Sequence, residues 1–164
     1  MELAEIRSIY RKTEQFTVIL LILALPAFGS VYLYQNSATL SWNMPSMPVL
    51  IEYSLAAICT VSIVSHYVIF HRKIKQSFGQ ETLVEKVKTY CAATERRFLL
   101  LFMVSIFATI GLLFSKNPVF TIIFAVALVF FSLGKPSPDR MARLMKLKKE
   151  DRELIREASR SEVN

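Results

Sequence analysis

The stretch FLLLFMVSIFATIGLLFSKNPVFTIIFAVALVFFSL, residues 98–133, decides the fold of this chain. As one helix it would be about 54 Å long at about 1.5 Å per residue, far more than the roughly 30 Å of hydrocarbon in a bilayer. Its middle, FSKNPVF, supplies a charge, an Asn suited to an N-cap and a Pro suited to the first helical position. The stretch therefore predicts two helices, over 98–115 and 117–134, joined by a tight turn.

Two earlier stretches, 16–34 and 48–70, are similarly apolar. The first holds no charged residue, and the second holds only Glu52, close to its start. Apolar residues make up 53% of the 164 positions, which exceeds the usual share in soluble domains. Buried helices of a soluble protein are the alternative, but such helices show a polar face and these do not. We predict an all-α integral membrane protein, a four-helix bundle of two tandem transmembrane hairpins with amphipathic cytoplasmic segments.

The basic residues indicate how the four spans are oriented. Of the 20 Lys and Arg, 19 lie in the N-terminal segment 1–15, the connection 71–97 or the tail 135–164, and the exception is Lys116. Cytoplasmic loops of membrane proteins carry such an excess of Lys and Arg. We therefore expect a multi-pass protein of the cell (inner) membrane with both termini cytoplasmic, so that residues 16–134 form the transmembrane domain.

The net charge of +7 fits the same placement. Anionic lipids of the cytoplasmic leaflet attract Lys and Arg near the membrane surface, so a lipid bilayer is the expected partner of this charge. A nucleic-acid partner is not expected, because acidic residues are interleaved with the basic ones and no aromatic reading motif accompanies them.

The first span has an alternative interpretation as a cleaved signal peptide. A basic segment and an apolar run precede the small residues AFGS at 27–30. Segment 1–15 is long for such a signal and holds three Glu. Cleavage would also remove the first span and disturb the charge pattern, so we favour an uncleaved span.

Two of the cytoplasmic segments are expected to be helical. Residues 80–92 place Leu83, Val84, Val87, Tyr90 and Cys91 on one face, which predicts an amphipathic helix that lies on the membrane or packs against the tail. In the tail, Ser137 and Pro138 are typical of a helix start, and two apolar patches flank the charged run KLKKEDRE. The tail predicts one solvated helix or two short ones. It is the candidate docking site for a cytoplasmic partner, or else a charged anchor for the topology.

Four polar side chains follow one side of the second span: Glu52, Cys59, Ser62 and His66. Their spacing of seven, three and four residues predicts a stripe, which suits an ion or proton path, a metal site or a helix contact. Glu52 and His66 are 14 residues apart, or about 21 Å along a helix, too far to share a proton or a metal ion. We favour a helix contact with a polar group near each end, and we expect neither a metal nor a cofactor.

Small residues predict where the spans touch. They are Ala56 in the second span, beside Cys59 and Ser62, then Ser105, Ala108 and Gly111 in the third, and Thr121 and Ala125 in the fourth. Helices in lipid associate through close contact at such residues and through hydrogen bonds between helices. We expect these positions to form the contacts between the spans.

The sequence contains no HExxH, CxxC or GxSxG motif and no Gly-rich phosphate loop, so we do not expect an enzyme. The plentiful contact surfaces instead predict a non-catalytic accessory or interaction subunit that binds a protein partner in the membrane or the cytoplasm. The alternative is a small homo-oligomeric transporter or channel in which Glu52 and His66 act on the transported species.

Overall fold

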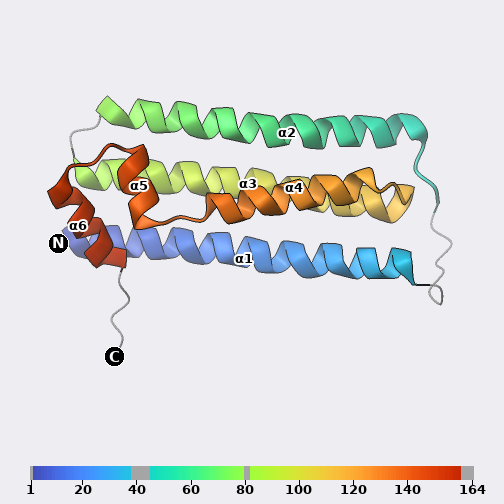
Figure 1. Cartoon of the computed structure of the whole chain (residues 1–164), viewed down its shortest axis with the longest axis horizontal. Helices are drawn as coiled ribbons and strands as arrows, with labels where there is room; N and C mark the ends of the chain where they lie inside the picture. Colours follow the sequence, from blue (N-terminus) through green and yellow to red (C-terminus); the bar gives the residue numbers. More distant parts are fainter. Residues whose placement is uncertain (1, 38–44, 80–81, 160–164) are drawn as a thin grey trace.

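The computed structural model describes residues 2–37, 45–79 and 82–159 (Figure 1). In chain order these residues form α1 (Glu2–Asn36), α2 (Val49–Gln76), the short 3-10 helix η1 (Ser77–Gly79), α3 (Leu83–Ser115), α4 (Val119–Gly134), α5 (Pro138–Leu144) and α6 (Lys149–Ser159). None of the described residues lies in a strand. The predicted all-α class is therefore confirmed.

Three helices, α1, α2 and α3, are each long and apolar enough to cross a membrane. The fourth apolar helix, α4, has 16 residues, and an 87° bend separates it from α5. Length and composition therefore give three candidate spans, or four if the bent pair of α4 and α5 counts as one.

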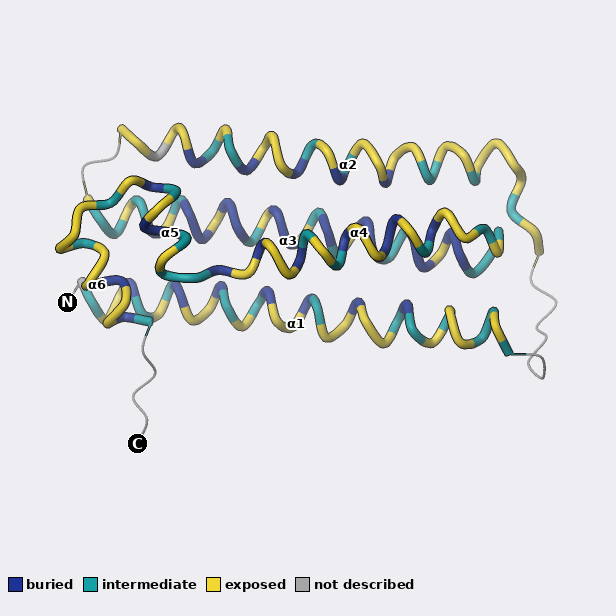
Figure 2. The backbone as a smooth tube through the Cα atoms, in the orientation of Figure 1, coloured by how far each residue is buried: buried dark blue, intermediate teal, exposed yellow. Residues whose placement is uncertain are grey.

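The central element is α3, which packs against α1, α2 and α4. In Figure 1, α1 and α2 lie on its two sides and α4 runs along it, so that α3 separates α1 from α2. Figure 2 shows that the outward sides of α1 and α2 are exposed along their whole length, whereas much of α3 is buried. The apolar interior is therefore built around α3.

At one end of the molecule the helices continue past their apolar stretches. α1 begins at Glu2, well before residue 16, and α2 continues to Gln76. α3 begins at Leu83, so the expected separate helix over 80–92 is instead the start of α3, and residues 80–81 lie outside the described part. Glu, Lys and Arg favour helices about as well as Leu does, so a change from apolar to charged residues does not end a helix.

The start of α5 follows the predicted capping chemistry, whereas α4 begins at Val119 with Pro118, and not Asn117, at its N-cap position. The Asn117 side-chain oxygen accepts a hydrogen bond from the N–H of Val119 at 2.9 Å. The Ser137 hydroxyl accepts one from the N–H of Arg140 at 3.2 Å, and Pro138 occupies the first turn of α5. Each of these two hydrogen bonds satisfies a backbone donor that the helix itself leaves without an acceptor.

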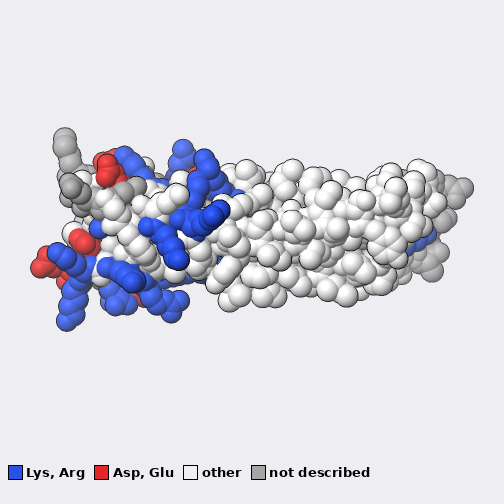
Figure 3. Space-filling model, turned by 90° about the horizontal axis from the view of Figure 1, so that it is seen from above, with Lys and Arg blue, Asp and Glu red and all other residues white. Residues whose placement is uncertain are grey.

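The charged side chains are gathered at the end of the molecule that holds the start of α1 together with α5 and α6. Figure 3 shows Lys, Arg, Asp and Glu crowded there, and a long middle section without any of them on the face shown. We call these two parts the charged end and the apolar body.

Candidate functional site

The polar stripe of α2 lies on the side that packs against the rest of the molecule. Cys59 and His66 are buried, at 0% and 1% exposure, whereas Glu52 and Ser62 are half-buried. The Glu52 carboxylate accepts a hydrogen bond from the side-chain amide of Asn117, in the turn between α3 and α4. The four residues are therefore spread along α2, and the structure does not bring them together into one site.

His66 is enclosed in the apolar body, and Arg97 is close enough to act on it electrostatically. Its ring meets the Phe130 ring edge-on at 4.9 Å, and neither ring nitrogen has a hydrogen-bond partner among the described residues. A buried polar group without a partner costs about 1–3 kcal/mol. Within the described ranges there is also no group of three or more His, Cys, Asp or Glu placed to hold a metal ion.

The small residues of α3 lie where it packs. Ser105, Ala108 and Gly111 are all buried, and Ala56 of α2 is half-buried beside the same apolar cluster. A Cβ atom added at Gly111 would overlap the ring of Phe120, so glycine is what allows α3 and α4 to approach this closely.

The side of α4 that packs inward differs from the expected one. Thr121 is half-buried and Ala125 is exposed. The residues that α4 buries are mostly large: Phe120, Ile123, Phe124, Ala127, Phe131 and Gly134. The buried phenylalanines make more van der Waals contacts with the neighbouring helices than a pair of small residues four positions apart would, and this sets the rotation of α4.

The charged end has an apolar cluster of its own that joins five helices. Its buried members are Ile6, Tyr10, Phe70, Ile74, Val87, Tyr90, Cys91, Ala93, Met141, Met145, Ile155 and Ala158. The start of α3 therefore packs against the tail, which is one of the two arrangements expected for it. Of the two apolar patches of the tail, expected to bind a cytoplasmic partner, Met141, Met145, Ile155 and Ala158 are covered by the chain itself, whereas Leu154 is 40% exposed.

Side-chain hydrogen bonds between helices hold the charged end together. The Tyr10 hydroxyl donates to the carbonyl oxygen of Pro136 at 3.0 Å, which connects α1 to the link between α4 and α5. The Thr13 hydroxyl donates to the Glu95 carboxylate at 2.7 Å, which connects α1 to α3. α1 is thus fixed to both the central helix and the tail.

Asp139 connects the two short helices of the tail. Its carboxylate accepts hydrogen bonds from Arg156 at 2.7 Å and from Arg152 at 3.3 Å. The hydrogen bond from Arg156, followed by the positive charge of both guanidinium groups, holds the pKa of Asp139 below its usual value.

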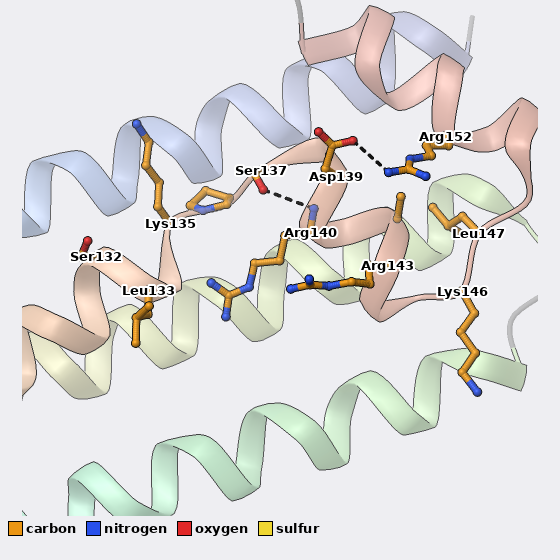
Figure 4. A pocket seen from close by; sticks show the side chains of 12 residues that line it. Ser132, Leu133, Lys135, Ser137, Asp139, Arg140, Arg143, Lys146, Leu147 and Arg152 are labelled. Atoms are coloured by element: carbon orange, nitrogen blue, oxygen red, sulfur yellow. Dashed lines mark hydrogen bonds and ion pairs between the residues drawn. The ribbon is translucent and has the colours of Figure 1, made fainter.

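A hollow of about 990 Å³ opens where α4 bends into α5 (Figure 4). The residues around it are Ser132, Leu133, Lys135, Pro136, Ser137, Asp139, Arg140, Ala142, Arg143, Lys146, Leu147 and Arg152. Five of these side chains are basic, and Asp139 is the one acid among them. We call this feature the basic hollow. Sequence reasoning did not find it, because only the bend after Gly134 brings these residues around one space.

Arg97 is buried close to the end of α4, with 4% of its surface exposed. Its guanidinium carbon lies 5.2 Å from the centre of the Phe70 ring, and its Nε atom has no hydrogen-bond partner among the described residues. A Cβ atom at Gly134 would lie 3.5 Å from that carbon. In the sequence, Arg97 is the last residue of the expected connection 71–97, and it is buried because α3 extends through this position.

Comparisons with known proteins give no further guide. No protein family, no curated protein and no solved structure matches this chain. Its function is therefore inferred from the contacts and charges described above.

Proposed function

We propose that this chain is an integral membrane protein of the cell (inner) membrane, with four spans arranged as a helix bundle and both termini in the cytoplasm. The support is the separation of the charged end from the apolar body (Figure 3). Large apolar side chains such as Ile22 and Val61 are more than half exposed on that body, at 60% and 66%. A hydrocarbon surrounding makes such exposure favourable, and the Lys and Arg excess puts the charged end in the cytoplasm.

In this proposal α4 is the fourth span. Its 16 residues rise about 24 Å, a little short of the roughly 30 Å hydrocarbon layer. Local thinning of the bilayer and extension of a flanking side chain such as Lys135 toward the water compensate for a mismatch of this size.

The role of the whole chain in this proposal is non-catalytic. The chain binds another membrane polypeptide through α3. One observation carries this proposal: α3 is the central helix, yet Leu99, Met103 and Ile110 on it are 48%, 44% and 39% exposed. Their spacing of four and seven residues places them on one stripe, on the side of α3 away from its buried residues. A helix bound along this stripe would pack beside the one helix that already contacts α1, α2 and α4.

Photo-crosslinking in native membranes tests this function. A photoreactive amino acid replaces Met103 on the stripe, and a matched control replaces Ile122, which is 63% exposed on α4. We expect position 103 to give a protein adduct of defined mass and position 122 to give lipid adducts. Lipid adducts alone at both positions would contradict the proposal, and an adduct of twice the chain mass would identify the partner as a second copy.

A homo-oligomeric transporter or channel is the second candidate, and the enclosed His66 without a hydrogen-bond partner favours it. Glu52→Gln and His66→Ala should then abolish a flux into proteoliposomes while the helical content stays unchanged. Wild-type flux in both variants would mean that the stripe on α2 is structural.

A further inference from the structure

The side chains of the basic hollow divide into two groups. In Figure 4, Asp139 points to one side, where it meets Arg152. The side chains of Arg140 and Arg143 extend from α5 to the other side, toward α2, and lie next to each other. The acid and the two arginines therefore do not neutralise one another.

The positive charge on the α2 side has no acidic partner in the described part of the chain. Within residues 2–37, 45–79 and 82–159, no carboxylate forms an ion pair with Arg140 or Arg143. Lys146 adds to this charge and lies over the Phe78 ring at 5.7 Å. The buried Arg97 is close enough to Arg140 for the two charges to repel. A group of cations without a counter-charge attracts an anion, and paired guanidinium groups suit phosphate oxygens.

The position of the basic hollow favours a lipid over a soluble anion. If α4 crosses the bilayer, the 87° bend lays α5 along the membrane surface. Arg140 and Arg143 then lie at the depth of the lipid phosphates. Leu133 of α4 lines the hollow with them, and Val129 lies one turn further along α4. These two side chains are 59% and 56% exposed, an apolar surface that suits an acyl chain.

We propose that the basic hollow binds the phosphate headgroup of an anionic phospholipid from the cytoplasmic leaflet, through Arg140 and Arg143. The lipid's acyl chain lies along α4 over Leu133 and Val129. This inference rests on the proposed membrane placement, with α4 as a span. It names a lipid ligand at the basic hollow, separate from the polypeptide partner of the α3 stripe.

Native mass spectrometry of the full chain in detergent tests the site. The chain is titrated with phosphatidylglycerol or with phosphatidylcholine of the same acyl chains. We expect phosphatidylglycerol to bind about tenfold more tightly, and Arg140→Gln with Arg143→Gln to remove that preference. The matched control, Lys148→Gln with Lys149→Gln, removes the same charge from two exposed positions at the start of α6 and should keep the preference.

Three results would overturn the proposal. They are equal binding of the two lipids to the wild-type chain, an equal loss of preference in the control variant, and full competition by soluble glycerol phosphate, which would indicate a free-phosphate site. Circular dichroism and size exclusion check the fold of each variant. If the double variant is misfolded, the single variant Arg143→Gln decides, because this side chain is exposed.

Alkaline carbonate extraction separates the two proposals. A chain that stays in the membrane but does not prefer phosphatidylglycerol contradicts the lipid site alone. A chain that is extracted contradicts the membrane placement itself, and the lipid site with it.

Discussion

The helices are held together in different ways in the charged end and in the apolar body. At the charged end, Tyr90, Met141 and Ile155 from different helices meet in one cluster, and the short tail helices complete it. In the body, α3 and α4 meet where Gly111 lets the ring of Phe120 come close. In water, removal of apolar surface drives association, whereas in lipid close contact between helices replaces it. The proposed bilayer placement therefore predicts that the two regions respond to different mutations.

The largest expected effect is in the charged end. Met141 is fully buried, at 0% exposure, so Met141→Ala should destabilise the packing of α5 and α6 by about 2–5 kcal/mol. Hydrogen exchange should rise across α5 and α6 while the apolar body stays protected. Leu154→Ala, at a position 40% exposed on α6, is the control and should have little effect. Equal protection in both variants would mean that the tail does not depend on this cluster.

The apolar body should be most sensitive at Gly111. Gly111→Ala places a Cβ atom against the buried Phe120 ring, with an expected cost of about 1–3 kcal/mol in the unfolding free energy. Gly29→Ala is the matched control, because a Cβ atom there meets nothing within 4 Å. Thermal unfolding in detergent compares the two. If they unfold at the same temperature, the close contact between α3 and α4 is not important for stability.

A smaller effect of opposite sign is expected at His66. His66→Leu should stabilise the chain by about 1 kcal/mol, because it removes two buried ring nitrogens that have no partner. His71→Leu should give no such gain, since Nδ1 of His71 lies 3.1 Å from the carbonyl oxygen of Tyr67. Unfolding in denaturant measures both variants. A destabilised His66→Leu variant would indicate that the imidazole has a partner in the membrane.

The smallest effect concerns the link between α5 and α6. Arg156 and Arg152 lower the pKa of Asp139, so this link stabilises the folded tail. Its contribution is complete at pH values above the usual Asp pKa of about 3.9. The contribution is lost as pH falls through the lowered pKa of the folded state. Hydrogen exchange in α6 should rise over that acidic range, and Asp139→Asn should remove this pH dependence. An unchanged pH profile in the variant would assign the transition to another group.

Local features of the fold could be predicted from the sequence. The turn at Asn117 and the start of α5 at Ser137 depend on side chains that bond to backbone groups two or three residues away. The apolar stretches and the one-sided distribution of Lys and Arg likewise need no knowledge of tertiary contacts. Such signals are sufficient for the all-α class and for the candidate spans.

Features that depend on the packing of distant segments could not be predicted. The exposed Ala125 shows that small residues on an apolar helix do not indicate which side packs, because the larger phenylalanines decide it. Arg97 became a buried residue only because α3 continues past the apolar stretch. The basic hollow needs the bend after Gly134. Ser137 and Pro138 indicate locally that a new helix starts there, but no local signal gives the 87° angle of the bend.

The contact between α6 and α1 has a consequence for how the chain is made. A ribosome synthesises α1 more than a hundred residues before α6, so Ile6 and Tyr10 emerge long before Ile155 and Ala158 can cover them. An unfinished chain therefore displays apolar side chains that a finished one hides. Proteases and chaperones that bind exposed apolar segments would therefore act on an unfinished chain more than on a finished one. The finished chain is protected once α6 has been translated and has folded against α1.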